Sequence, residues 1–174
     1  DYTGKWKALQ YASRHFFEPV CVSVEETKKD YKIYAINDLR EEKNVKIVIT
    51  LSNVGGKVIS SNELTKTLSP LSSECVFCAD IKGNKKEIFL SVKMYENDVL
   101  ISERTKIFVP DRDLKLKPDT IEKSVSYENG EIVVKMKSPV FCRSVMVDIE
   151  DFREPFSDNY FDLLPNEEKI VTVK

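Results

Sequence analysis

The sequence contains a single histidine, His15, and this scarcity limits the chemistry that the chain can carry. A catalytic triad needs a histidine close to a serine or cysteine nucleophile, and no such motif accompanies His15. We therefore expect His15 on a helix surface or at an interface. A structural zinc site needs about four ligands, so Cys75 and Cys78 form at most an incomplete half-site. The sequence predicts no catalytic residue, no metal and no cofactor.

The chain also lacks a basic block, a long apolar run and a signal-peptide pattern. Its 27 lysines and arginines are balanced by 29 aspartates and glutamates, so we expect neither nucleic acid nor an anionic membrane as a partner. No apolar run approaches the roughly 20 residues that span a bilayer. The missing signal pattern says little, because the opening stretch looks like the end of a larger unit.

Four cysteines, at positions 21, 75, 78 and 142, are scattered through strand-like sequence. We interpret them as buried free thiols in a reducing compartment, although the spacing leaves a disulfide open. This interpretation slightly favours a cytoplasmic location, and the compartment itself stays unknown.

The chain opens with a short amphipathic helix. Thr3 is a candidate N-cap, Pro19 ends the helical pattern, and the apolar stripe at helical spacing consists of Trp6, Leu9, Ala12 and Phe16. A helix of this length is marginal alone, and no second long helical pattern follows. We expect Trp6, Leu9, Phe16 and Phe17 to be buried against a larger partner or against the first sandwich.

After Pro19 the period of the hydrophobic pattern changes to two, which is typical of half-buried antiparallel strands. The expected strands are 20–24, 31–35, 45–51, 58–60, 74–79, 88–95 and 99–109. Turn signals separate them at Gly55-Gly56, Gly83-Asn84 and Asn97-Asp98. Tyr31, Tyr95 and Tyr160 are expected partly in the cores. Short strands at this spacing predict a β-sandwich.

A stretch with two prolines and many charges, residues 110–119, interrupts the pattern and predicts a domain boundary. Strand sequence resumes at 121–127, 132–136, 141–149 and 170–173, with a hairpin signal at Asn129-Gly130. The expected fold is all-β, with two tandem sandwiches behind one short helix. The expected segments are the helix at 1–18, a first sandwich at 19–110 and a smaller second sandwich at 111–174.

The second module contains an aromatic and polar stretch at 156–165. Ser157, Asp158 and Asn159 favour a structural corner that leads into a strand beginning at Tyr160. The functional alternative is a sugar or cation site formed by Asp158, Asn159 and Asp162. A further acidic group, which we interpret as a surface charge network rather than a pocket, consists of Asp148, Glu150 and Asp151 with Arg143 and Arg153.

Three stretches together resemble β-mannosidases of glycoside hydrolase family 2. Gly4-Lys5-Trp6-Lys7-Ala8-Leu9-Gln10-Tyr11 with Phe16-Phe17-Glu18-Pro19-Val20 is similar to the segment that closes the catalytic (β/α)8 barrel and enters the next sandwich. Tyr-Ala-Ile-Asn-Asp-Leu at 34–39 is similar to the following strand and corner. Phe156 to Pro165 looks like the family's last immunoglobulin-like domain. The residues that carry the resemblance are Trp6, Phe16, Phe17, Asp38, Phe156, Asp158, Asn159 and Phe161.

The match is that of a divergent member, because the family more usually has histidine at the position of Gln10 and alanine at that of Glu18. The resemblance implies two immunoglobulin-like sandwiches after a leftover barrel helix. It also implies a parent enzyme that removes terminal non-reducing β-mannose with two carboxyl groups about 5 to 5.5 Å apart. Those two glutamates belong to barrel strands upstream of residue 1, so the chain itself is expected to be inactive.

The expected role is therefore non-catalytic: the chain packs on the missing barrel and shapes access of the parent's β-mannoside substrate. A homo-oligomer is compatible with this role, and no metal is expected. One alternative keeps the architecture but assigns the parent to another family 2 glycosidase. A second alternative is a free-standing sugar-binding or adhesion module. Its weakness is the single tryptophan, which lies on the helix instead of forming an aromatic platform on a sandwich face.

Overall fold

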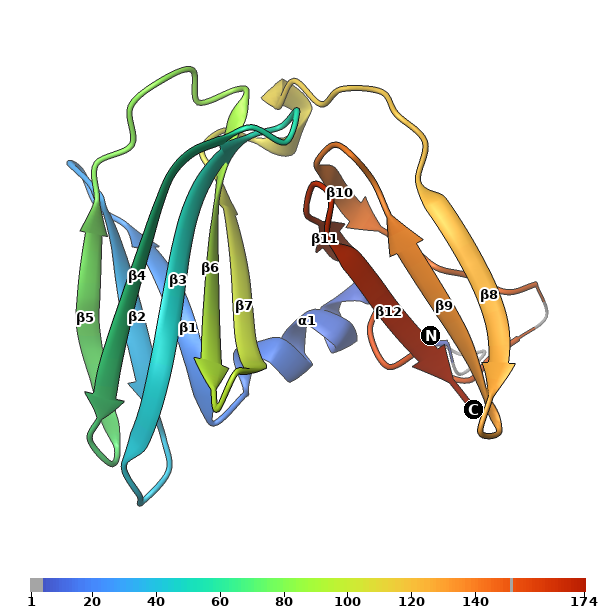
Figure 1. Cartoon of the computed structure of the whole chain (residues 1–174), viewed down its shortest axis with the longest axis horizontal. Helices are drawn as coiled ribbons and strands as arrows, with labels where there is room; N and C mark the ends of the chain where they lie inside the picture. Colours follow the sequence, from blue (N-terminus) through green and yellow to red (C-terminus); the bar gives the residue numbers. More distant parts are fainter. Residues whose placement is uncertain (1–4, 151) are drawn as a thin grey trace. The chain divides into compact units, whose positions relative to one another are not determined.

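The structure, a computed structural model, describes residues 5–150 and 152–174 (Figure 1). The candidate cap Thr3 and the acid Asp151 lie outside the described residues. The chain divides into two units. One contains residues 16–53 and 57–115, and the other contains the described part of 1–15 together with 54–56 and 116–174. We describe each unit by itself.

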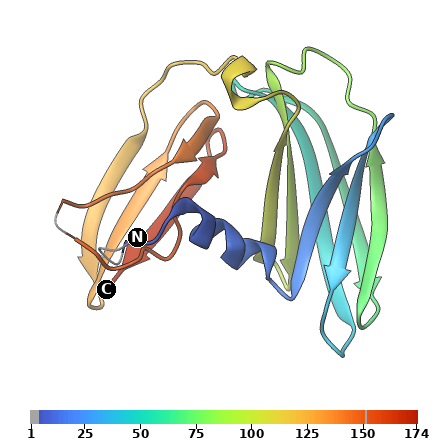
Figure 2. The ribbon, with the colours of Figure 1, turned by 180° about the vertical axis from the view of Figure 1, so that it is seen from behind.

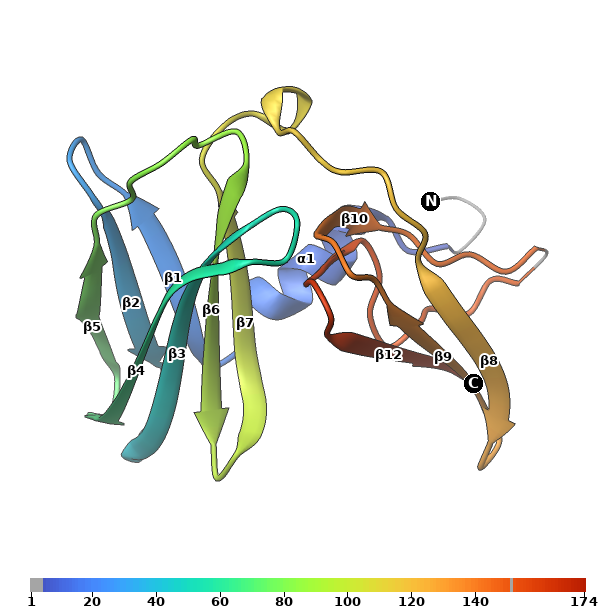
Figure 3. The same ribbon diagram turned by 45° about the horizontal axis from the view of Figure 1, so that its top comes forward.

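The first unit is a β-sandwich of two antiparallel sheets. Its strands are β1 (Val20–Glu26), β2 (Tyr31–Asn37), β3 (Lys43–Asn53), β4 (Val58–Leu68), β5 (Ser72–Ala79), β6 (Ile88–Glu96) and β7 (Val99–Ile107), followed by a 3-10 turn, η1 (Asp111–Asp113). One sheet has the order β1-β2-β5 and the other β4-β3-β6-β7, and the two face each other (Figure 3). This arrangement is that of an immunoglobulin-like sandwich.

Alternation along β3 and β6 builds the core of this sandwich. Ile47 pairs with Met94 and Ile49 with Val92, and these side chains are at most 2% exposed. Because opposed residues of antiparallel strands share a face, each apolar row of one strand meets the apolar row of its neighbour. The expected strands 45–51 and 88–95 therefore lie within β3 and β6.

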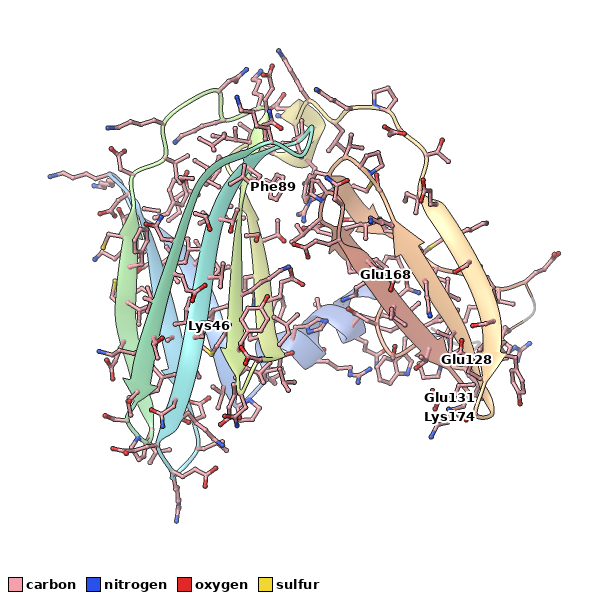
Figure 4. The ribbon with its side chains drawn as sticks, in the orientation of Figure 1. Lys46, Phe89, Glu128, Glu131, Glu168 and Lys174 are labelled. Carbon is pink, nitrogen blue, oxygen red and sulfur yellow. The ribbon has the colours of Figure 1, made fainter. Side chains whose placement is uncertain are left out.

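The β6–β7 hairpin turns at Asn97 and Asp98, whose φ angles are 50° and 62°. Both angles lie in the left-handed region that Asn and Asp tolerate better than most residues, which suits a tight two-residue turn. The carboxylate of Asp98 accepts a hydrogen bond of 2.8 Å from the Lys46 ammonium, and Figure 4 labels Lys46 on β3. The turn is thus tied to the neighbouring strand.

The second unit joins helix α1 (Ala8–Phe16), through its residues up to His15, to a smaller set of strands (Figure 2). These are β8 (Glu122–Glu128), β9 (Glu131–Lys137), β10 (Cys142–Val145), β11 (Phe161–Leu163) and β12 (Glu168–Val173). They form sheets of order β12-β9-β8 and β10-β11. Apolar side chains of both sheets, among them Met136, Leu163 and Val171, make one buried cluster with Tyr11 of the helix.

Turns in this unit use positive φ angles where the sequence offers Asn or Gly. The β8–β9 hairpin turns at Asn129 and Gly130, with φ of 53° and 85°. Beside it, Glu131 pairs with Lys174 at 3.7 Å, and Figure 4 shows both at this end of the sheet. Gly56 has a φ of 90°, and a Cβ there would lie 2.8 Å from the Pro139 carbonyl oxygen. Any larger residue at Gly56 would have to adopt an unfavourable positive φ and would clash with this oxygen.

The expected strand 141–149 is wrong beyond residue 145. Strand β10 ends at Val145, its register against β11 shifts between Cys142 and Val145, and Ser144 has a φ of 51°. After this irregularity, the Val147 N–H donates to the Asn159 side-chain oxygen at 2.8 Å instead of to a neighbouring strand. A side chain has taken the place of a ladder partner, so Val147 and Ile149 pack against the cluster without forming a strand.

The apolar stripe of the opening helix is largely uncovered within this chain, and its expected burial against a larger partner stays a prediction. The buried residue of α1 is Tyr11, which is 4% exposed, whereas Leu9, Phe16 and Phe17 are 73%, 61% and 84% exposed. Trp6 is half-buried and packs against the cluster of the second unit. The helix has turned the face carrying Tyr11 to that core, because a tyrosine ring can fill it while its hydroxyl finds a polar partner.

The thiols differ from expectation as well. Cys21 is buried and Cys142 is half-buried, but Cys75 and Cys78 are exposed, and the structure has all four as free cysteines. Within the described residues there is no group of three or more His, Cys, Asp or Glu side chains placed to hold a metal ion. In the same part of the chain, no helix has both the length and the apolar character that crossing a bilayer requires.

Candidate functional site at the helix-docking corner

The feature that organises the second unit is the attachment of α1 to the corner that precedes β11. Tyr11 is buried in the cluster, and its hydroxyl accepts a hydrogen bond of 3.2 Å from the Phe156 N–H. Its ring lies 5.4 Å from the Trp6 ring and 6.0 Å from the Tyr160 ring. One side chain therefore supplies both apolar packing and a hydrogen bond to the corner backbone. We call the residues Tyr11, Arg14, His15 and 156–160 the docking corner.

The last turn of the helix adds polar bonds to the same corner. The Arg14 guanidinium donates to the Ser157 carbonyl oxygen at 3.1 Å, and it lies 5.7 Å from the centre of the Trp6 ring. His15 Nε2 lies 3.1 Å from Asp158 Oδ1. Basic groups at the C-terminal end of a helix are favoured by its dipole, so this end is suited to an acidic partner.

Asp158 is the acidic partner, and its environment holds it ionised. Lys169 on β12 lies 2.7 Å from its second oxygen, and the carboxylate is 13% exposed. Burial raises the pKa of Asp158, but hydrogen bonds from His15 and Lys169 and the Lys169 charge outweigh it and lower this pKa to about 2. The docking corner is thus fixed by one partly buried carboxylate that the helix and the strand share.

Asn159 shapes the backbone of the corner and is 7% exposed. Its amide nitrogen donates to the Val147 carbonyl at 2.7 Å, and its oxygen accepts from the N–H groups of Val147 and Tyr160. The Asn159 N–H in turn donates to Asp158 Oδ1 at 2.9 Å. These are the local side-chain to backbone bonds expected at a structural corner, and they let Tyr160 adopt a φ of 57°.

The three residues considered for a sugar or cation site have separate partners. Asp158 bonds His15 and Lys169, Asn159 bonds the Val147 backbone, and Asp162 forms an ion pair of 2.5 Å with Arg143. Asp162 also accepts a hydrogen bond from the Ser144 N–H at 3.1 Å. The structure therefore brings Asp158 and Asn159 together but directs Asp162 to β10.

A pocket of about 260 Å³ lies between the start of the helix and the loop after β10. Its walls combine the aromatic rings of Trp6, Tyr11 and Tyr160 with the ion pair of Lys5 and Asp148, whose atoms are 2.9 Å apart. Asp148 thus pairs with Lys5, which precedes helix α1, while Arg143 pairs with Asp162. Arg153 lines the pocket and Glu150 is not among its lining residues.

The remaining expected residues lie in cores or on the surface. Phe156 and Phe161 are 5% and 9% exposed in the second cluster. Phe16 lies 5.9 Å from the Arg104 guanidinium and remains largely exposed. Asp38 follows β2, where its N–H donates to the Pro19 carbonyl at 2.8 Å. Tyr31 is buried, Tyr95 is half-buried and Tyr160 is 36% exposed.

Sequence reasoning missed Tyr11 and Arg14 as members of the docking corner, and it missed Lys169 of β12 as the partner of Asp158. Tyr11 lies off the predicted stripe, so helical periodicity alone did not select it. The available signal was the pair of basic residues Arg14 and His15 in the last turn, which indicates an acidic partner for the helix end. Lys169 gave no signal, because its partner is distant along the chain.

Comparison with known proteins agrees with this architecture. Residues 29–113 match the family model "Mannosidase Ig/CBM-like domain", and residues 116–174 match "Ig-fold domain" of the mannosidase type. The chain is similar to Beta-mannosidase A of Aspergillus oryzae, with 26% identity over 191 residues that cover 98% of this chain and 21% of the relative. It is also 24% identical to Beta-mannosidase of Capra hircus, covering 92% of this chain and 20% of the relative.

Solved structures share the fold. The crystal structure of Beta-D-Mannosidase from Dictyoglomus thermophilum has a TM-score of 0.88 at 22% identity, covering 99% of this chain and 21% of that one. The exo-chitosanase CsxA of Amycolatopsis orientalis has a TM-score of 0.66 at 14% identity, covering 94% and 24%. This chain therefore spans about a fifth of the length of the β-mannosidases that it matches. Its two sandwiches belong to the mannosidase immunoglobulin-like domain families, and the chain corresponds to the C-terminal region of a glycoside hydrolase family 2 β-mannosidase.

Proposed function

We propose that this chain is the non-catalytic C-terminal region of a β-mannosidase-type retaining glycosidase and that it supports the catalytic barrel. The observation that carries the proposal is that both sandwiches match mannosidase domain models. The similar β-mannosidases are about five times longer than this chain. On this proposal, the parent hydrolyses terminal non-reducing β-mannose, and both catalytic glutamates lie upstream of residue 1. We retain 1–18, 19–110 and 111–174 as the proposed segments.

Helix α1 is, on this proposal, the last helix of the barrel, and the docking corner attaches it to the last sandwich. The face with Tyr11 is held by the corner, while Leu9 on the helix and Phe17 after it are 73% and 84% exposed. Large apolar side chains left uncovered in this way are typical of surfaces that a partner covers. On this proposal, the partner that covers them is the barrel of the parent enzyme.

An activity comparison tests the proposal. The isolated chain should not hydrolyse an aryl β-mannoside, and the longer parent enzyme should hydrolyse it. Turnover by the isolated chain, or a parent that lacks β-mannosidase activity, would contradict the proposal.

Paired variants test the role of α1. Leu9→Lys and Phe17→Lys should change the free energy of unfolding of the isolated chain by less than about 0.5 kcal/mol, because both side chains are exposed there. The same changes should lower the melting temperature and activity of the parent by placing charges in an apolar interface. Val125→Lys, at a site 63% exposed on β8, serves as the matched surface control. Equal effects in chain and parent would contradict a barrel contact.

The likeness of fold to exo-chitosanase CsxA supports a second candidate, in which the parent is another exo-glycosidase of the same architecture. Aryl β-glucosaminide assayed beside aryl β-mannoside distinguishes the two. Saturable binding of manno-oligosaccharides to the isolated chain at submillimolar concentration would instead favour a free-standing sugar-binding module.

A further inference from the structure

An extra residue in strand β5 changes which side chains face solvent. In the pairing with β2, Ile33 lies opposite Phe77 and Tyr34 opposite Cys75, so Val76 has no partner of its own in the register. This is the two-against-one count of a β-bulge. Consistent with it, the consecutive residues Val76 and Phe77 both pack against the core of the first sandwich.

The bulge brings two thiols to the same side of the strand. Residues three apart in a regular strand point to opposite faces, but one inserted residue shifts the alternation by one. Cys75 and Cys78 are accordingly both exposed, with their sulfur atoms 3.9 Å apart. Strand β5 is at the end of the sheet order β1-β2-β5, so both thiols lie on an edge strand.

The surroundings separate this pair from the other two cysteines. Cys78 lines a pocket of about 110 Å³ whose other walls include Ile49, Leu51 and Leu90. The hydrogen bond with Cys75 is the largest of the causes that raise the pKa of Cys78. Cys21 is 6% exposed, and burial raises the pKa of its thiol. Cys142 is half-buried on β10 and hydrogen-bonds Ser138 and Val140.

We propose that Cys75 and Cys78 form a reversible oxidation site whose substrate is a low-molecular-weight disulfide such as oxidised glutathione. The thiolate of one cysteine of the pair attacks one sulfur of the disulfide, giving a mixed disulfide and releasing one thiolate. The thiolate of the other cysteine then attacks the protein sulfur of the mixed disulfide and releases the second. Two protein thiols are oxidised to one intrachain disulfide, and the small disulfide is reduced to two thiols. Closure shortens the sulfur separation to about 2.05 Å.

An exposed bridge on an edge strand should be labile. Disulfides that are exposed or strained have more oxidising potentials than buried structural ones, and small thiols reduce them readily. The oxidation state of the pair therefore follows the redox state of the surrounding thiol pool.

Treating the whole chain with oxidised glutathione and mapping its peptides by mass spectrometry tests this proposal. We expect the loss of two hydrogen atoms in mass, one disulfide that joins Cys75 to Cys78, and full reversal by reduced glutathione. The variant with Cys21→Ala and Cys142→Ala should react in the same way. A stable glutathione adduct on Cys75 or Cys78 of the unmodified chain, a bridge to Cys21 or Cys142, a link between two chains, or no reaction would each overturn it.

Single variants separate the two steps. Cys78→Ser should accumulate glutathione on Cys75, because no thiol remains to resolve the mixed disulfide. Cys75→Ser should accumulate the adduct on Cys78 for the same reason. Both positions are exposed, so serine should preserve the fold, which circular dichroism checks. A single variant that reacts with oxidised glutathione but retains no glutathione adduct would overturn the assignment of Cys75 and Cys78 as the pair that resolves the mixed disulfide.

Discussion

His15 at the end of helix α1 and Asp158 at the corner before β11 are joined by a contact of 3.1 Å between Nε2 and Oδ1. The two residues are 143 positions apart in the chain. The same carboxylate binds Lys169 of β12 at 2.7 Å, so one side chain connects a helix, a corner and a strand. Three such sets of contacts and one backbone conformation lead to four predictions about stability.

The first concerns acid stability. Because the pKa of Asp158 falls from 3.8 to about 2 on folding, its ionised form stabilises the native state above about pH 4, and this contribution is lost as the pH falls toward 2. Asp158→Asn should cost about 2 kcal/mol at neutral pH and converge with the unmodified chain near pH 2. Urea unfolding between pH 2 and 7 measures this difference in the free energy of unfolding. Asp98→Asn, whose side chain is 89% exposed, should change stability much less.

The second concerns the anchor of the helix. Tyr11→Phe removes the bond from the Phe156 N–H and should cost about 1 kcal/mol, whereas Tyr11→Ala also opens the cluster and should cost about 3 kcal/mol. The single tryptophan, Trp6, should report the alanine variant by its fluorescence, since its ring lies 5.4 Å from Tyr11. Leu9→Ala is the control and should change the free energy of unfolding by less than about 0.5 kcal/mol. Equal losses at Leu9 and Tyr11 would contradict the observed orientation of α1.

The third concerns a buried amide in the first sandwich. Asn37 is 0% exposed, and its amide nitrogen donates to the Glu41 and Ser69 carbonyls at 2.8 and 3.0 Å. Asn37→Ala should cost about 3 kcal/mol, because it removes a fully buried amide together with its hydrogen bonds to both carbonyls. Chemical denaturation measures the loss. Asn44→Ala, which removes one exposed bond from Thr67, should cost much less, and a similar loss at both sites would refute the argument.

The fourth concerns backbone strain between β4 and β5. Leu71 has a φ of 50°, is 68% exposed, and its N–H donates to the Leu39 carbonyl at 3.0 Å. Leu71→Gly should stabilise the chain by about 0.5 kcal/mol, because glycine adopts this conformation without a Cβ penalty. Leu71→Ala keeps the penalty and should be nearly neutral. Thermal unfolding distinguishes them, and a glycine variant less stable than the alanine variant would disprove the strain.

Much of the sandwich architecture was predictable because it depends on local alternation. The pattern of Val45, Ile47 and Ile49 predicts a half-buried strand wherever its neighbours lie, and the structure has that strand. The turns at Asn97-Asp98 and Asn129-Gly130 were predictable for the same reason, since φ preference is a property of the residue itself.

The docking corner and the thiol pair were not predictable in the same way. Periodicity selected the stripe of Leu9 and Phe16, but within this chain the helix packs through Tyr11, because the shape of the second core decides which face fits it. The two-residue gap between Cys75 and Cys78 suggested an incomplete metal half-site, and strand alternation would have separated the thiols. A bulge set by pairing with β2 brought them together.

The sequence by itself therefore determined the all-β class, the two-domain order and the resemblance to β-mannosidases, because strand periods, turn residues and motifs are local. Only the tertiary structure decided which side of α1 is buried, that Asp158 is shared by His15 and Lys169, and that two thiols lie 3.9 Å apart. These features depend on contacts between residues distant in the chain or on the register between strands, and no local pattern encodes either.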